Sequence, residues 1–155
     1  MYLSDIRWYR CEKAATSKAV IKTKSKIKFK LPQLYYDLMM ICDAGAPLKT
    51  DFDYYDNSHK CKMSQALGCF LGLEDNEYNI VKSFLNSPEF FPEGLIAFAE
   101  TGGGDYICFD YRERKDNLDP PIVYWSHEAD VGKDVSFVAK NFEEFLRILK
   151  EPEDE

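Results

Sequence analysis

GLIAFAETGGGDYICFDYR, residues 94–112, places three consecutive glycines between two runs of apolar and aromatic residues. A phosphate-binding P-loop has the pattern GxxxxGK[ST] and leads into a helix, whose N–H groups and dipole meet the phosphate. Here no lysine follows Gly104, and the next segment, Tyr106–Tyr111, has the aromatic and β-branched character of a strand. Glycines also supply the positive φ that a hairpin turn requires. The stretch therefore predicts two antiparallel strands joined by a glycine turn.

The strand pattern continues from this hairpin toward the C-terminus. Four segments are rich in β-branched and aromatic residues and bounded by Gly, Pro or Asp: Leu95–Glu100, Tyr106–Tyr111, Ile122–His127 and Val135–Ala139. A last helix is expected after Asn141, which can cap it, with Glu144 completing a capping-box-like pair. These elements predict an α+β fold, a mostly antiparallel sheet flanked by N-terminal, middle and C-terminal helices.

The N-terminal half carries an unusual lysine pattern. In IKTKSKIKFK, residues 21–30, lysines occupy every second position, which predicts an extended strand with all five ammonium groups on one face. These are Lys22, Lys24, Lys26, Lys28 and Lys30. The face is either a solvent-exposed edge that discourages strand pairing or a docking stripe for an acidic surface.

Other segments of this half predict short elements. LPQLYYDLMMICDAGAP, residues 31–47, is typical of a helix with Pro32 at its first position and Gly45 and Pro47 after its end. Short helices are also expected within residues 3–15 and after a cap at Asp75 or Asn76. Residues 51–60 are expected to form a polar loop, and residues 61–73 one or two strands interrupted at Gly68.

Length and composition indicate one domain, residues 1–155, with a core at 31–149, a lysine-rich segment at 1–30 and an acidic tail at 151–155. No run approaches the roughly 20 apolar residues of a membrane span, and the charged N-terminus is unlike a signal peptide. The five cysteines are odd in number and none forms a CxxC pair, which favours reduced thiols and a cytoplasmic protein.

The net charge of −7 conceals an asymmetry. Residues 13–36 contain seven lysines and no acid, so the rest of the chain holds 13 basic and 27 acidic residues, a balance of −14. Such a body repels phosphate backbones and attracts basic partners, with association that weakens as salt rises. We therefore expect a protein partner, with no nucleic acid and no membrane, although acidity also serves solubility alone.

Carboxylates and tyrosines of two segments are the candidate partner-binding residues. They are Asp51, Asp53, Tyr54, Tyr55 and Asp56, together with Glu100, Asp105, Tyr106 and Asp110. Tyrosine supplies contact area and carboxylates supply complementary charge, although 51–56 could equally be a polar loop with tyrosines packed beneath. Alternation places Tyr106, Cys108 and Asp110 on a face that meets water or a cleft.

A catalytic alternative would combine the carboxylates near the glycine turn with His127 for acid–base chemistry or cation binding. No spacing here resembles a known ligand loop, and turn carboxylates are usually solvated. We expect no catalytic residue, no metal and no cofactor.

LPQLYYDLM, FPEGLIAFAETGGGDYICFDYR, DPPIVYWSHE and VAKNFEEFL, in this order, resemble the SUKH superfamily, which contains the fungal Smi/Knr cell-wall assembly regulators and many bacterial immunity proteins. The resemblance covers most of residues 31–149 and departs at 21–30, where relatives usually carry a more helical approach that contains acids. It implies an α+β fold, no enzymatic activity and, in bacteria, an immunity protein that binds and blocks a toxin, often a nuclease. The alternatives are a regulatory adaptor for an endogenous protein and a small metal-dependent hydrolase.

Overall fold

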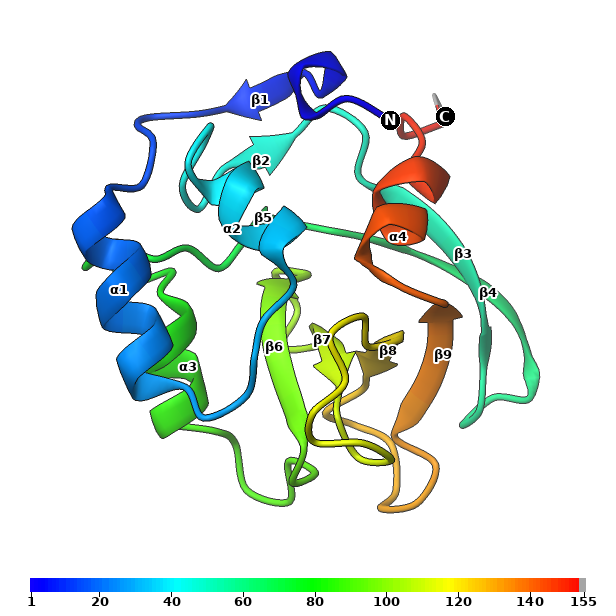
Figure 1. Ribbon diagram of the computed structural model, residues 1–155. Coiled ribbons are helices and arrows are strands. Elements are labelled where there is room, and N and C mark those ends of the chain that lie inside the picture. Colours follow the sequence, from blue (N-terminus) through cyan, green and yellow to red (C-terminus); the bar gives the residue numbers. More distant parts are fainter. Residues whose placement is uncertain (154–155) are drawn as a thin grey trace.

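The computed structural model describes residues 1–153, which form an α+β fold built around an antiparallel sheet (Figure 1). Five strands lie in the order β5-β6-β7-β8-β9: β5 Cys69–Phe70, β6 Leu95–Glu100, β7 Tyr106–Asp110, β8 Ile122–Trp125 and β9 Val135–Ala139. Two smaller antiparallel sheets pair β1 (Trp8–Arg10) with β2 (Ala46–Pro47), and β3 (Asp51–Asp56) with β4 (Cys61–Ala66). The predicted fold class is confirmed.

The glycine stretch is a turn between β6 and β7, as predicted. Gly102 and Gly104 have φ of +89° and +98°, and the Thr101 N–H donates to the Asp105 carbonyl at 3.2 Å to close the turn. Only glycine adopts that backbone region without strain. The next element is β7 rather than a helix, so this loop has no helix N-terminus to offer a phosphate.

Four α-helices surround the sheet: α1 Ser17–Lys26, α2 Gln33–Met39, α3 Ile80–Leu85 and α4 Phe142–Ile148. A 3₁₀ turn, η1, spans Leu3–Asp5. Figure 1 shows α1 and α3 side by side at one end of the molecule and the β3–β4 hairpin at the other. The Asn141 side chain accepts the Glu144 N–H at 2.8 Å, so the predicted cap of α4 is confirmed.

An aromatic cluster joins α2 and α4 to the sheet. The Phe98 ring stacks on Phe109 at a centroid distance of 4.4 Å. Phe142 of α4 packs edge-on against Phe98 at 5.3 Å. Tyr35 of α2 packs edge-on against Phe109 at 5.7 Å. Rings of this size each bury some 150–250 Å² and prefer these offset and edge-to-face arrangements, so a few residues hold both helices against one face of the sheet.

The predicted strand at 21–30 is wrong, because residues 17–26 form α1. Lysine is a good helix former, and this helix buries only Ala19 and Thr23, four residues apart, so it needs no wide apolar stripe. The Thr16 hydroxyl caps it by accepting the Ala19 N–H at 3.2 Å. The alternation does match the burial of residues 27–31, a non-helical segment with a bend at Lys28 and Phe29, in which Ile27, Phe29 and Leu31 are buried and Lys28 and Lys30 are exposed.

Three further local predictions are also corrected. Residues 51–56 are strand β3 rather than a loop, because its alternate residues Phe52, Tyr54 and Asp56 are buried, a period of two that the interleaved acids conceal. Residues 3–15 contain η1 and β1 rather than one helix. The cap of α3 is Asn79, whose side chain accepts the Lys82 N–H at 2.9 Å, and not Asp75 or Asn76. The predicted break at Gly68, between β4 and β5, is confirmed.

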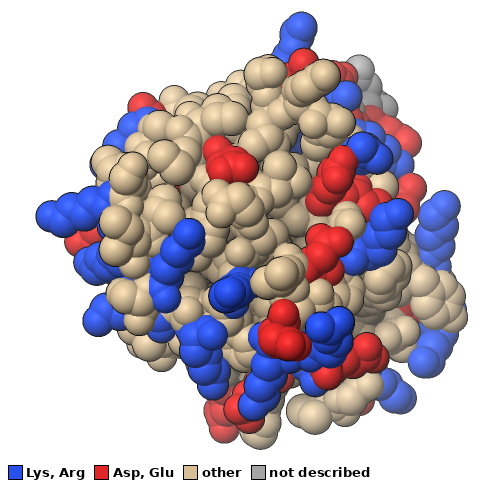
Figure 2. Space-filling view, viewed as in Figure 1, with Lys and Arg blue, Asp and Glu red and all other residues tan. Residues whose placement is uncertain are grey.

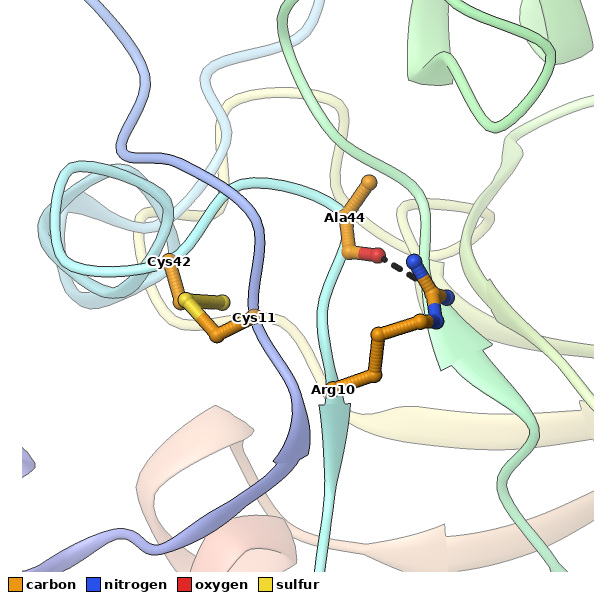
Figure 3. The surroundings of a disulfide bond; sticks show 4 residues. All are labelled: Arg10, Cys11, Cys42 and Ala44. Carbon is orange, nitrogen blue, oxygen red and sulfur yellow. Dashed lines mark hydrogen bonds between the residues drawn. A yellow bond between two sulfur atoms is a disulfide. The ribbon is translucent and has the colours of Figure 1, made fainter.

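The prediction of five reduced cysteines is wrong for Cys11 and Cys42, which form a disulfide with Cα atoms 5.7 Å apart (Figure 3). Two backbone hydrogen bonds bring their segments together, from the Ala15 N–H to the Met39 carbonyl and from the Asp43 N–H to the Lys13 carbonyl. Such long-range pairing has no local signature. Cys61, Cys69 and Cys108 are free thiols. Within residues 1–153, none of the helices has both the length and the apolar character that a bilayer crossing demands.

Candidate functional site

The sheet register divides the predicted binding residues into two groups. Glu100 and Tyr106 are direct partners across β6 and β7, so their side chains share a face. Asp105 precedes Tyr106 and projects to the opposite face, where it meets Tyr124 and lies on the side of the β3–β4 hairpin. Asp105 therefore joins the hairpin residues of 51–56, whereas Glu100, Tyr106 and Asp110 lie across the sheet.

Asp105 is the centre of a hydrogen-bonded cluster at the glycine turn. One carboxylate oxygen accepts the hydroxyl hydrogen of Tyr124. The other accepts the backbone N–H of His127 at 2.9 Å and lies 2.6 Å from Nδ1 of its ring. The imidazole is thereby fixed in orientation while its side chain is still 40% exposed. Its Nε2 lies 3.7 Å from a carboxylate oxygen of Glu128 at the surface.

A matching cluster lies in the hairpin. The Asp56 carboxylate is buried and accepts both the backbone N–H and the ring Nδ1 of His59, each at 2.7 Å. The Tyr54 hydroxyl reaches its other oxygen at 3.4 Å. Burial by itself would raise the pKa of Asp56, but the hydrogen bonds from His59 and Tyr54 outweigh it and hold that pKa below its usual value. Asp56 is therefore ionised at neutral pH.

Two stacked tyrosines connect these clusters. The Tyr54 and Tyr124 rings lie 4.9 Å apart at an angle of 25°. Burial, and then the neighbouring carboxylates, raise the pKa of both hydroxyls, so each remains a donor at neutral pH. We call His59, Asp56, Tyr54, Tyr124, Asp105 and His127 the tyrosine–carboxylate bridge.

The hairpin is also attached to β9. Asn57 donates its backbone N–H to the Ser136 hydroxyl at 2.9 Å and its side-chain amide to the Val135 carbonyl at 2.6 Å. Together with the bridge, these contacts fix the hairpin to both the sheet edge and the glycine turn. The hairpin and the turn therefore present one preorganised surface.

The remaining hairpin residues line the outside of this surface. Tyr55 is 56% exposed, between Tyr54 and Asp56, which are both buried. Asp53 bonds to the Ser64 hydroxyl and forms an ion pair with Lys150 Nζ at 3.1 Å, and these contacts, Ser64 first, lower its pKa. Asp51 exchanges two backbone hydrogen bonds with Lys150. The hairpin surface thus combines an exposed tyrosine with carboxylates that are already held in place.

The second group has a different environment. Asp110 binds Arg112 through two hydrogen bonds of 2.9 Å, so its charge is compensated within the chain. Tyr106 stacks on Trp125 at 6.0 Å and contacts Phe91. Burial raises the pKa of Glu100. Cys108, predicted to share an open face with Tyr106 and Asp110, is fully buried. The expectation that this face meets water or a cleft is therefore wrong at Cys108, where the sheet is covered.

The hydrolase alternative required carboxylates of both groups to meet His127. The structure brings only Asp105 to His127, and it places Asp110 against Arg112. Among residues 1–153, no three His, Cys, Asp or Glu side chains gather in a way that could hold a metal ion. The bridge orients two imidazoles and presents hydrogen-bonding groups at the surface.

Sequence reasoning missed Tyr124 and His59 and set His127 aside. A signal for His127 was present in the strand pairing. Tyr106 pairs with Trp125, so the residue before Tyr106 must lie beside the residues that follow Trp125. Tyr124 faces the hairpin because Trp125 faces the other side. His59 gave no such signal, because a loop had been expected where the hairpin lies.

The chain matches the SMI1 / KNR4 family (SUKH-1) over residues 14–148. It is also similar to the SPbeta prophage-derived uncharacterized protein YokK of Bacillus subtilis (strain 168), with 32% identity over 91 residues. That alignment covers 57% of this chain and 44% of the relative, so the match spans less than half of the relative's length. The family match includes α1, the β3–β4 hairpin and strands β6 to β9. The chain therefore belongs to the SMI1/KNR4 (SUKH-1) family.

Proposed function

We propose that this chain is an immunity protein that binds a cognate toxin and neutralises it by occlusion. Membership of the SUKH-1 family carries this proposal, because the family is of the immunity-protein type and is typically non-catalytic. The cytoplasm, where an immunity protein meets an incoming toxin, is the proposed compartment.

The hairpin and the glycine turn form the proposed toxin-binding surface. Tyr55 offers an exposed ring, and Asp56 and Asp105 of the bridge hold the accessible imidazoles of His59 and His127 in fixed positions. Preorganised groups lose little freedom when a partner binds, so more of the contact energy appears as affinity. Tyrosine is enriched among the residues that dominate interface energetics.

Charge supports a basic partner. Outside residues 13–36 the chain carries a balance of −14. On the face shown in Figure 2, basic side chains predominate over the α1 end, whereas acidic ones are mixed with them toward α4 and the hairpin. A nuclease that grips phosphate with lysines and arginines would be attracted at long range by this net negative charge, and an acidic inhibitor would also mimic its substrate.

Co-expression with the toxin domains encoded beside this gene tests the proposal. Growth of cells that produce such a toxin should be restored by this chain, and the purified pair should bind more weakly as salt rises. Tyr55→Ala should weaken binding by about tenfold or more, as expected of a central interface tyrosine. Tyr9→Ala is the matched control, because Tyr9 is 80% exposed on β1, at another part of the molecule.

Failure of every neighbouring toxin to bind would overturn the immunity role. Equal effects of Tyr55→Ala and Tyr9→Ala would leave the role intact and overturn the choice of surface. Binding that is unaffected by salt would contradict the charge argument.

A further inference from the structure

A second charged feature lies at the α1 end of the molecule, away from the hairpin. Lys24, Lys26, Lys28 and Lys30 line a cavity of about 680 Å³, which we call the lysine cleft. Its other lining residues include Gln33 and Tyr36 of α2 and Leu118 of the loop between β7 and β8. Within residues 1–153, none of these four lysines lies within 4.0 Å of a carboxylate.

The local sequence explains how four lysines reach one cavity. Helix α1 ends at Lys26, and the chain then bends at Lys28 and Phe29 before α2 begins. Ile27, Phe29 and Leu31 are buried in this segment, whereas Lys28 and Lys30 are exposed. The end of the helix and the bend after it bring the last lysines of α1 and the alternate lysines of the next segment to the same cavity.

Two of the ammonium groups are held over aromatic rings. Lys24 Nζ lies 5.0 Å from the Tyr36 ring centroid, and Lys28 Nζ lies 5.5 Å from that of Phe29. Cation–π contacts of this kind limit the motion of a lysine without neutralising its charge. The side chains are therefore partly ordered while their charge remains available to a ligand.

Two acidic residues adjoin residues that line the cleft, and within residues 1–153 neither forms an ion pair with its lysines. Asp119, next to Leu118, accepts a hydrogen bond from the Asn141 amide at 3.0 Å. Asp37, one residue beyond Tyr36 in α2, accepts a hydrogen bond from the Gln33 amide at 2.9 Å. Four uncompensated positive charges around one cavity repel one another. An anionic ligand would relieve this repulsion, which fixes the sign of the ligand's charge.

The walls favour a peptide over a nucleic acid. Single-stranded nucleic acids bind by stacking bases on accessible aromatic faces, but here Tyr36 and Phe29 are buried, and Phe29 already stacks on Tyr111 at 4.7 Å. Leu118, by contrast, is 68% exposed at the cavity and offers an apolar contact. The volume lies within the roughly 300–1,000 Å³ of ligand sites, which suits several side chains rather than one phosphate.

We propose that the lysine cleft binds a linear acidic peptide segment of a partner protein, with carboxylates on the four lysines and an apolar side chain against Leu118. This proposal does not rest on the immunity function, because it concerns a different surface and a ligand of opposite charge.

A fluorescein-labelled peptide of repeated Glu-Glu-Leu units is the probe, measured by fluorescence anisotropy. The cleft variant K24Q/K26Q/K28Q/K30Q should bind it at least about tenfold more weakly than the unaltered chain, since each exposed pair contributes up to about fivefold. The matched control K60Q/K62Q/K133Q/K140Q has the same net charge and should retain affinity within about twofold. Both variants replace only exposed lysines, and circular dichroism checks their helix content.

Leu118→Ala supplies a test that leaves every charge in place. It should weaken binding of the Glu-Glu-Leu peptide and leave that of a Glu-Glu-Ser peptide unchanged. Equal loss of affinity in the cleft and control variants would show a general charge effect and overturn the proposal. Absence of saturable binding, or tighter binding of an oligothymidylate of equal charge, would also overturn it.

Discussion

Tyr124 on β8 donates its hydroxyl hydrogen to Asp105, the residue that directly follows the glycine turn. The same tyrosine stacks on Tyr54 of the hairpin. One side chain therefore connects the turn, the central sheet and the hairpin, three segments that are distant in sequence. The carboxylate of Asp105 carries this connection onward to His127.

Tyr124→Phe should lower the free energy of unfolding by about 1–3 kcal/mol, the usual cost of losing a hydrogen bond to a charged group. The ring and its stacking on Tyr54 are retained, so the loss measures the hydrogen bonding of the hydroxyl, chiefly its bond to Asp105. Urea unfolding measures it, and the midpoint of thermal unfolding should fall by about 2–4 °C per kcal/mol. Tyr55→Phe, at an exposed position of the hairpin, is the control. A Tyr124→Phe protein as stable as this control would show that the bond contributes nothing.

Alanine substitutions at the three glycines of the turn should destabilise the chain to different degrees. Gly103→Ala should be close to neutral, because its φ is not in the left-handed region and the nearest atom to an added Cβ is 3.9 Å away. Gly102→Ala should cost about 1–2 kcal/mol from backbone strain alone, since its φ is +89° and the space around it is open.

Gly104→Ala should be the most damaging of the three. It combines a φ of +98° with a Cβ position only 3.0 Å from the His127 ring, and the ring is held by Asp105. The free energy of unfolding should therefore be highest for Gly103→Ala, lower for Gly102→Ala and lowest for Gly104→Ala. Equal effects at positions 102 and 104 would mean that the imidazole moves aside without cost.

The C-terminal half could be predicted from sequence because its signals are local. The glycine turn, the strands on either side of it and the Asn141 cap each depend on residues within a few positions of one another. The N-terminal half depends on distant contacts. Helix α1 is set by burial of Ala19 and Thr23 against the rest of the fold, which overrides the period of the lysines.

The candidate site was only partly predictable for a similar reason. Composition drew attention to the acids and tyrosines, but the partners that determine their surroundings come from other strands. Asp110 and Asp105 look alike in sequence, yet Arg112 compensates the first and the second holds His127. Deciding between them required the register of β6, β7 and β8.

Cys11→Ser should destabilise the chain by about 3–4 kcal/mol under oxidising conditions. The disulfide joins residues 31 positions apart, and restraining a loop of that length in the unfolded chain has about this effect. Cys11 is exposed, so placing serine there should by itself change stability little. Cys42 is buried, so a substitution there would also change the packing around it. Thermal unfolding with and without dithiothreitol measures the effect.

Dithiothreitol should lower the midpoint of the unaltered chain to that of Cys11→Ser and leave the variant unchanged. Cys61→Ser, which removes an exposed free thiol, should behave like the unaltered chain. An unaltered chain that does not respond to the reductant would show that the Cys11–Cys42 bond does not stabilise the fold.

Asp56→Asn should reduce stability at neutral pH and flatten its dependence on acid. The folded pKa of Asp56 lies below its usual value of about 3.9, so the ionised carboxylate adds stability that is fully present above about pH 4. That contribution is lost as pH falls through the lowered folded pKa. Asparagine keeps the shape, and its amide oxygen can still accept from His59, but these hydrogen bonds are no longer to a charged group, so about 1–2 kcal/mol should be lost at pH 7.

The difference in unfolding free energy between the unaltered chain and Asp56→Asn reports the Asp56 carboxylate together with its pairing to His59. It should shrink below about pH 4. Burial raises the pKa of Asp43, which acts in the opposite direction, but Asp43 is present in both proteins and cancels in the difference. Asp116→Asn, at an exposed position, should show no such trend. A difference that persists unchanged at pH 2 would mean that Asp56 stabilises the hairpin through shape rather than charge, and the carboxylate would then lose its role in the bridge.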